Sequence, residues 1–429
     1  MSFRNKLVGN AAIYLGANVL NAGIPFLLLP VLTRVLSPAD YGTLAMFGVA
    51  LSILGAFTGL SVHGAIGVRY FTLKQDELAE YVAACMAILA ASTATLLVVV
   101  VVCGRWLADI SGVPVDWLMV AVIVSGLQFL GNIRLSLWQV AGHAKKYATF
   151  QVSQSLLNAT LSLLFILGLG LAWQGRVLGQ AIAVGLFGVT ALWLLRKDAL
   201  LCFGAQLRLH GADALAFGIP LIPHVLGALV LATSGQFFVT NMIGIGATGI
   251  YVVAAQVGAV VGLIADAFVK SYAPWLYQQL KDQSPASKNL VVGVSYAVFL
   301  FFLALSALAS VFVYAVFPLV VGQQFMAARA LSVFFIFGNG FTGMYLAVAG
   351  FFFFTSKTRF VSVVSISSGV LSIGVMYVCG RAFGLEGIAF AFLASQVVMF
   401  LLAWAGANLV YPMPWLQLRP ALAAVFLKK

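Results

Sequence analysis

Long runs of hydrophobic residues alternate with short polar connections along the whole chain. The runs are continuous and do not alternate with a period of two residues, which favours helices over strands. A helix needs about 20 apolar residues to cross a membrane core of about 30 Å. The pattern predicts twelve such helices, at residues 9–33, 41–66, 81–103, 117–140, 150–173, 177–195, 215–242, 249–272, 289–318, 328–354, 361–380 and 387–410.

The twelve predicted helices form two similar sets of six. The connection at residues 36–42 precedes the second helix, and a similar connection at residues 243–249 precedes the eighth. Two prolines lie in the first helix and two in the seventh, so both are predicted to be interrupted. Interrupted helices at matching places in two halves indicate the central site of a transporter. We therefore predict six-helix lobes at 1–200 and 201–412, and a cytoplasmic amphipathic tail at 413–429.

Composition excludes a soluble protein. Of 429 residues, 63% are hydrophobic and 8% are charged, whereas about 25% of the residues of an ordinary soluble domain are charged. So few charges cannot cover the surface of a soluble globule of this size. The sequence predicts an all-α polytopic membrane protein.

The formal net charge of +12 reflects the orientation of the chain in the membrane. In the predicted topology, 17 Lys and Arg residues lie in the connections of one side and five lie on the other. Because cytoplasmic loops carry the excess of basic residues, both termini are predicted to be cytoplasmic, in a bacterial inner membrane. The charge is thus explained without a nucleic-acid partner.

Four segments carry a resemblance to a known family. They are residues 32–42 (Leu-Thr-Arg-Val-Leu-Ser-Pro-Ala-Asp-Tyr-Gly), 217–223 (Phe-Gly-Ile-Pro-Leu-Ile-Pro), 249–255 (Gly-Ile-Tyr-Val-Val-Ala-Ala) and 271–275 (Ser-Tyr-Ala-Pro-Trp). The chain resembles polysaccharide biosynthesis flippases, the O-antigen-type translocases of the multidrug/oligosaccharidyl-lipid/polysaccharide exporter superfamily. The resemblance implies a MATE-like fold and a transporter rather than an enzyme. Many such proteins carry an acid late in the seventh helix, where this chain has Thr-Ser-Gly-Gln at 233–236.

Ionisable residues inside a membrane are costly and are therefore candidates for function. Arg134 and Lys270 lie in the predicted helices, and Arg69 lies just beyond the end of the second. We predict that these three cations form a basic mouth, open to the cytoplasm, for a pyrophosphate group, since guanidinium groups bind phosphate with paired donors. The alternative is that each cation only reaches the membrane interface.

Three further charged residues have two interpretations each. Asp266 could couple transport to a proton gradient, but its position four residues before Lys270 favours an ion pair on one helix face. Arg34 and Asp40 flank the outer end of the first helix. They form either a gate or a loop ion pair of small energetic value.

Uncharged polar residues are more numerous than charged ones in the predicted helices, and several share a helix face at spacings of three or four. Such stripes could line a hydrated lumen and bind sugar hydroxyls, or they could hold helices together by hydrogen bonds. The stripe of three on the fifth helix favours a lumen. The candidates are Asn18, Asn21, Gln128, Asn132, Gln151, Gln154, Asn158, Gln236 and Gln256.

The function predicted from these features is a flippase for polyprenyl-pyrophosphate-linked oligosaccharide, working by alternating access between the two lobes. No cofactor, metal ion or catalytic residue is predicted, and polysaccharide-assembly proteins such as a polymerase are possible partners. The alternatives are a lipid II flippase or a multidrug/cation antiporter of the same superfamily, and a membrane polymerase or ligase. The sparse membrane carboxylates disfavour a cation exporter, and the short loops disfavour a polymerase or ligase.

Overall fold

A computed structural model describes residues 3–282, 284–357, 359–417 and 419–420. The described residues form helices and short connections and contain no strand. The chain folds as two compact units, Met1–Asn241 and Met242–Lys429. The division of the twelve predicted helices into two lobes of six at residue 200 stays a prediction.

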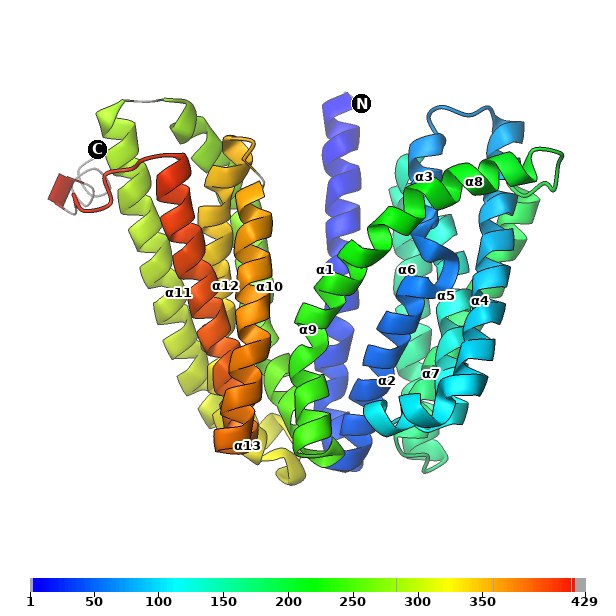
Figure 1. Ribbon diagram of the computed structural model, residues 1–429, viewed down its shortest axis with the longest axis horizontal. Helices are drawn as coiled ribbons and strands as arrows, with labels where there is room; N and C mark the ends of the chain where they lie inside the picture. The colour runs from blue at the N-terminus through cyan, green and yellow to red at the C-terminus, as the bar shows by residue number, and fades with distance from the viewer. Residues whose placement is uncertain (1–2, 283, 358, 418, 421–429) are drawn as a thin grey trace. The chain divides into compact units, whose positions relative to one another are not determined.

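The helices of the first unit follow the predicted order (Figure 1). They are α1 (Phe3–Val35), α2 (Pro38–Phe57), η1 (Thr58–Ser61), α3 (His63–Arg69), α4 (Gln75–Ser111), α5 (Val115–Val140), α6 (Ala144–Leu163), η2 (Leu164–Gly168), α7 (Trp173–Lys197), α8 (Leu207–Gly218), η3 (Ile219–Leu221) and α9 (Ile222–Met242). The second unit contains α10 (Ile245–Lys281), α11 (Pro285–Val320), η4 (Gln323–Phe325), α12 (Ala327–Phe354) and α13 (Arg359–Val410).

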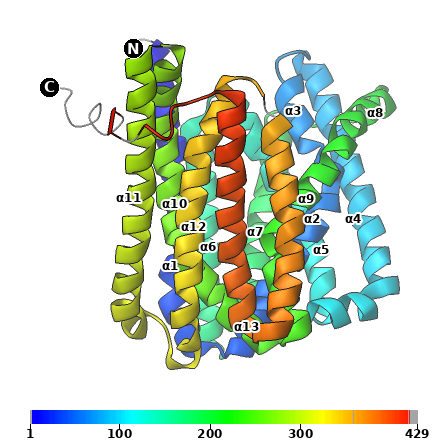
Figure 2. The same cartoon turned by 60° about the vertical axis from the view of Figure 1, so that its left-hand side comes forward.

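The described residues contain eleven helices that are long and apolar enough to cross a membrane. The last, α13, has 52 residues, which would extend about 78 Å if it were straight. Gly384, with φ 60° and ψ −134°, interrupts it. Figure 2 shows the two halves of α13, orange and red, side by side. Both predicted spans, 361–380 and 387–410, lie in this helix, so the prediction of about twelve membrane segments is confirmed.

Helix ends follow from local sequence. Ser37 caps α2: its hydroxyl accepts a hydrogen bond from the backbone N–H of Asp40, and the Asp40 carboxylate accepts one from the Ser37 backbone. This capping box satisfies two N–H groups that the first helical turn leaves open. Gly112, with φ 68°, ends α4 in the left-handed conformation that glycine adopts most easily.

The second membrane segment is interrupted where the sequence predicts one continuous helix at 41–66. Between α2 and α3, the residues Gly59, Leu60 and Ser61 all have positive φ angles. The Ser92 hydroxyl accepts a hydrogen bond from the Gly59 N–H at 2.8 Å. Positive φ costs a residue with a Cβ about 1–2 kcal/mol, so the surrounding structure must hold this break in place.

The predicted interruption of the first helix is wrong, because α1 runs through Pro25 and Pro30 as one helix. The seventh segment is interrupted as predicted, by the 3-10 turn η3 at Pro220. A proline removes one backbone hydrogen bond, and α1 tolerates that loss.

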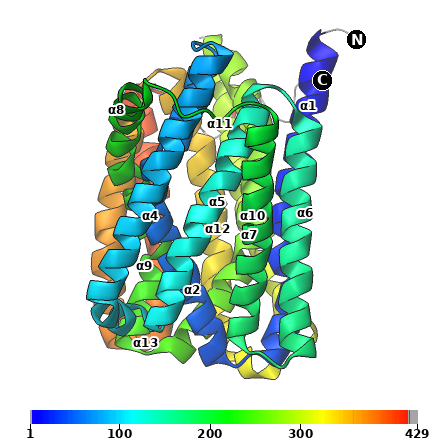
Figure 3. The same ribbon diagram turned by 90° about the vertical axis from the view of Figure 1, so that its right-hand side faces the viewer.

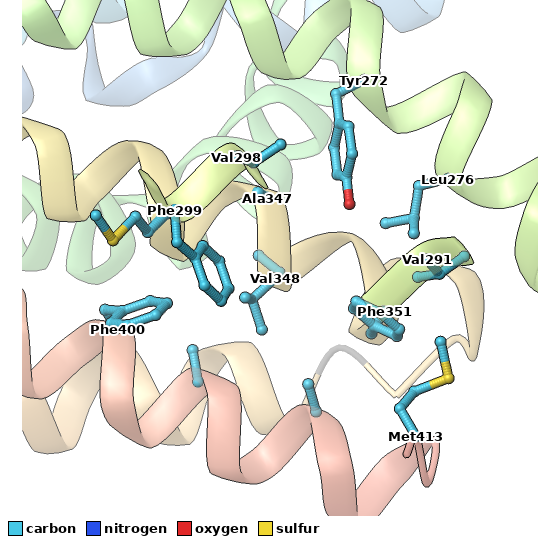
Figure 4. Packing of buried hydrophobic residues seen from close by; sticks show 14 of the residues in the cluster. Tyr272, Leu276, Val291, Val298, Phe299, Ala347, Val348, Phe351, Phe400 and Met413 are labelled. Atoms are coloured by element: carbon cyan, nitrogen blue, oxygen red, sulfur yellow. The ribbon is translucent and has the colours of Figure 1, made fainter. Parts of the chain in front are cut away.

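The second unit is held together by close packing of its helices. Figure 4 shows the core, in which Phe299, Val348, Phe351 and Phe400 come from α11, α12 and α13. The predicted tail joins this core at its start, because Trp415 is buried and its carbonyl accepts a hydrogen bond from the Tyr296 hydroxyl at 2.7 Å. Residues 418 and 421–429 of the tail lie outside the described residues.

In the first unit, α8 packs against α4 and α3, and an ion pair joins α8 to α3. The Arg69 guanidinium, at the end of α3, donates two hydrogen bonds to the Asp213 carboxylate of α8, one of them at 2.9 Å from Nε. The Tyr81 hydroxyl of α4 donates to the same carboxylate at 2.9 Å. Three helices therefore meet at Asp213, at the end of the unit where Figure 3 shows α8.

We expect Arg69→Gln and Asp213→Asn to be coupled. The pair is bidentate, but both side chains are more than a third exposed, so the coupling free energy should be about 1 kcal/mol. A double-mutant cycle of thermal unfolding in detergent measures it. Additive effects of the two substitutions would show that the pair does not hold α8 in place.

Candidate functional site

Uncharged polar side chains of the first unit surround a cavity of about 180 Å³. All of the described residues that line it are uncharged, and they come from α1, α5, α6 and α7. They are Asn21, Gln128, Gly131, Asn132, Leu135, Gln151, Gln154, Ser155, Asn158, Gln180 and Val184. We call this site the amide cavity.

Hydrogen bonds fix two of the amides. The Ser155 hydroxyl donates to Asn21 Oδ1, which joins α6 to α1. The Arg176 guanidinium of α7 donates to Asn158 Oδ1, and the same nitrogen, Nη1, donates to the Ser162 hydroxyl at 2.9 Å. Since a guanidinium only donates, Asn158 must present its oxygen to Arg176, and its NH₂ group is left for other partners.

The side-chain oxygen of Gln151, unlike that of Asn158, is unpaired. Its Oε1 atom is buried and has no hydrogen-bond partner among the described residues. A buried oxygen without a donor is costly. The cavity lining therefore combines an unpaired acceptor on Gln151 with amide donors on neighbouring helices, which suits a ligand that both donates and accepts, as a hydroxyl does.

The structure brings together six of the nine predicted lumen residues, from three stripes that the sequence placed on separate helices. Asn18 is exposed on α1 and does not line the cavity, and Gln236 is half-buried on α9. Gln256 lies on α10 of the second unit. A lumen role for these three stays a prediction.

Sequence reasoning missed Ser155, Gln180 and Arg176. Gln180 lies four residues after Arg176 on α7, so the two share a helix face. The spacing of four residues could have indicated a polar face on this helix. In the predicted topology, Arg176 is one of the five basic residues of the outer connections.

Each of the three predicted mouth cations is paired with a carboxylate. Arg134 of α5 pairs with Asp198 at the end of α7, and Arg69 pairs with Asp213. Lys270 donates to Asp266 at 2.6 Å, which confirms the ion pair that their spacing favoured. Arg134 lines two cavities, neither of which Arg69 lines. A shared role in a basic mouth stays a prediction.

The predicted gate residues lie at the α1–α2 connection. The Asp40 carboxylate accepts hydrogen bonds from the Ser37 backbone and hydroxyl, so it has a structural role as a helix cap. Arg34 is exposed in the last turn of α1. Gating by either residue stays a prediction.

A family comparison identifies the chain more closely. The sequence profile described as "Polysaccharide biosynthesis protein" matches residues 7–278. The chain belongs to the polysaccharide biosynthesis protein family. The resemblance predicted from the four sequence segments is thereby confirmed.

This family member is also similar to a curated bacterial protein. It is 24% identical over 378 residues to "Lsg locus putative protein 1" of Haemophilus influenzae, with 85% of this chain and 89% of that protein covered.

Two solved structures show the same fold as this polysaccharide biosynthesis protein. The lipid II flippase MurJ, in an inward closed conformation, matches with a TM-score of 0.65 and 12% identity over 97% of this chain and 90% of that chain. An inward-facing multidrug resistance MATE family transporter of the MOP superfamily matches with a TM-score of 0.62 and 16% identity, over 92% and 93% of the two chains. The predicted all-α, MATE-like polytopic fold is confirmed.

Proposed function

We propose that this protein is a flippase that moves a lipid-linked oligosaccharide, carried on polyprenyl pyrophosphate, from the cytoplasmic to the outer leaflet of a bacterial inner membrane. The observation that carries the proposal is the amide cavity, a polar site in a chain of which 63% of the residues are hydrophobic. Family membership and the MurJ-like fold support it. The two lobes would expose the site to each side in turn.

The chemistry of the cavity favours sugars over cations. The described residues of its lining offer amide and hydroxyl groups, which exchange hydrogen bonds with sugar hydroxyls, and no carboxylate to balance a cationic drug. Asp266, which could otherwise serve a cation, is neutralised by Lys270. An inside-negative potential would assist an anionic carrier by about 2.3 kcal/mol per charge per 100 mV.

The proposal is tested with the full chain in liposomes that hold a labelled polyprenyl-pyrophosphate oligosaccharide in both leaflets. A membrane-impermeant glycosidase is added outside. With a functional flippase, digestion should proceed from about half of the label towards all of it, whereas protein-free liposomes should stop at about half. Lipid II in parallel liposomes tests the nearest alternative substrate. If digestion stops at half with both lipids, the proposal is wrong.

Arg176 is expected to act as a positioning residue for the cavity. In Arg176→Met, the Asn158 amide loses the donor that fixes its orientation, and we expect the translocation rate to fall about tenfold. Arg176→Lys keeps the charge and one donor and should restore part of the rate. Equal rates for the methionine and wild-type proteins, at equal thermal stability, would remove Arg176 from the site.

A further inference from the structure

Two adjoining cavities lie at one end of the first unit and share no lining residue with the amide cavity. Their volumes are about 420 and 580 Å³, and both are lined by Arg134, Trp138, Lys146 and Asp198. The residues come from α5, from the start of α6 and from the end of α7. Figure 3 shows the end of α7 at the same end of the unit as α8. We call this site the Arg134 site.

The Arg134 site has an excess of positive charge. Among the described residues, four cations line the two cavities, and one carboxylate, Asp198, accompanies them. The cations are Arg134, Lys145, Lys146 and Lys197. Asp198 pairs with Arg134, so the three lysines are not balanced by the carboxylate of the site. The charge of the site favours an anion.

Two buried donors of the site have no partner. Arg134 is 3% exposed, and its Nε–H finds no acceptor among the described residues. Trp138 is 6% exposed, and its indole N–H is equally unsatisfied. Buried donors are nearly always hydrogen-bonded, so two orphan donors in one site indicate a ligand with several acceptor oxygens.

The geometry of Arg134 suits a phosphate group. Its guanidinium lies over the Trp138 ring at 4.5 Å from the centroid, which holds the plane of the fork in place. Trp138 in turn packs edge-on against Phe150. A fixed guanidinium fork matches the oxygens of phosphate better than a lysine ammonium does.

Part of the remaining lining is apolar. Phe150, Phe187 and Leu194 line the larger cavity beside the cations. A free phosphate would gain nothing from these side chains, whereas a lipid places hydrocarbon directly beside its phosphate. Basic pockets between membrane helices on the cytoplasmic side bind such head groups, and the charge distribution of this chain predicts that this end is cytoplasmic.

We propose that the Arg134 site binds the phosphate group of a membrane lipid. Arg134 donates to the phosphate oxygens, Trp138 supplies its indole N–H, and Lys146 and Lys197 add charge. The lipid is either an anionic glycerophospholipid of the surrounding membrane or the polyprenyl diphosphate of the substrate. Only the second source rests on the proposed function.

Native mass spectrometry of the purified full chain tests the proposal, because it distinguishes bound lipids by mass. The protein is incubated with phosphatidylglycerol, with polyprenyl diphosphate, and with phosphatidylcholine as the zwitterionic reference. We expect retention of at least one of the two anionic lipids above the reference, and the mass of the retained lipid identifies the source. Competition with inorganic pyrophosphate tests whether the phosphate group is the part that is recognised.

Substitutions should move lipid retention in opposite directions. Arg134→Gln should weaken retention about tenfold or more, and Trp138→Phe, which keeps the ring but loses the N–H, should weaken it less. Asp198→Asn removes the competing carboxylate and should strengthen retention. Lys197→Gln should weaken retention, whereas Arg196→Gln, which removes a neighbouring exposed cation outside the lining, should leave it unchanged.

A purely structural ion pair predicts a different result. Both Arg134→Gln and Asp198→Asn would then lower thermal stability, and neither would change lipid retention. That result, or equal retention of all lipids by wild type and Arg134→Gln, would overturn the proposal. Retention of phosphatidylglycerol that depends on Arg134 would support the site even if the liposome experiment showed no flipping, so the two proposals can fail separately.

Discussion

Gly258→Ala is expected to destabilise the second unit by about 1–3 kcal/mol. A Cβ atom at position 258 of α10 would lie 2.7 Å from the Phe335 carbonyl carbon and 2.9 Å from the Ile336 nitrogen, both in the backbone of α12. Backbone atoms cannot turn aside as a long side chain can, so the two helices must separate. Gly262, four residues later, packs against Asn339 of α12.

The reason for the large effect lies in the membrane environment. Lipid is as apolar as leucine, so helices in a bilayer associate through close packing, which small residues spaced four apart permit. The measurement is the thermal unfolding midpoint of the full chain in detergent, where we expect a fall of about 5 °C. Gly374→Ala is the matched control, because that α13 glycine has no neighbour within 4 Å of an added Cβ. Equal midpoints for the two variants would contradict the packing argument.

Hydropathy alone predicted the number and order of the membrane segments. It placed their ends less well, since α4 extends over Gln75–Ser111 where the prediction was 81–103. Hydropathy reports the part of a helix that lies in lipid, and α4 continues beyond it. Polar first turns such as that of α4, with Asp76 and Glu77, remain helical outside the apolar run.

The two helix interruptions show what proline can and cannot predict. Pro220 marks a real break, but α1 absorbs Pro25 and Pro30. The break at Gly59 has no proline, and the hydrogen bond that its N–H donates goes to Ser92, which lies 33 residues away. A break stabilised by tertiary contacts leaves no signal within the segment itself.

The ion pairs and the amide cavity also differ in whether their partners are close in the sequence or distant. The pair Asp266–Lys270 could be predicted because its members are four residues apart on one helix. The partners of Arg69 and Arg134 are 144 and 64 residues away, and spacing says nothing about them. Likewise, the polar stripes of α5 and α6 could be predicted separately, whereas their convergence on one cavity is a property of the packed helices.

Replacing Gln151 and Gln154 together by leucine is expected to reduce translocation of the lipid-linked oligosaccharide more than tenfold while leaving the folded protein intact. Both side chains line the amide cavity. A site that hydrogen-bonds hydroxyl groups loses at least about 1.4 kcal/mol, or tenfold, when such partners disappear. The liposome digestion rate, divided by the amount of folded protein, measures the effect.

Stability separates this interpretation from its alternative. If the two glutamines held helices together, their loss would lower the unfolding midpoint. Because Gln151 Oε1 has no partner in the part of the chain that the structure describes, replacing Gln151 by an apolar side chain of similar size should leave the midpoint unchanged or raise it.

Asn339→Leu provides the matched control. Asn339 on α12 donates a hydrogen bond to the Phe335 carbonyl at 2.9 Å and packs against Gly262, so its replacement should lower the midpoint without changing the rate per folded molecule. A double-leucine variant that behaves like Asn339→Leu would show that the glutamines hold helices together. A stable variant that no longer translocates would place the sugar among these amides.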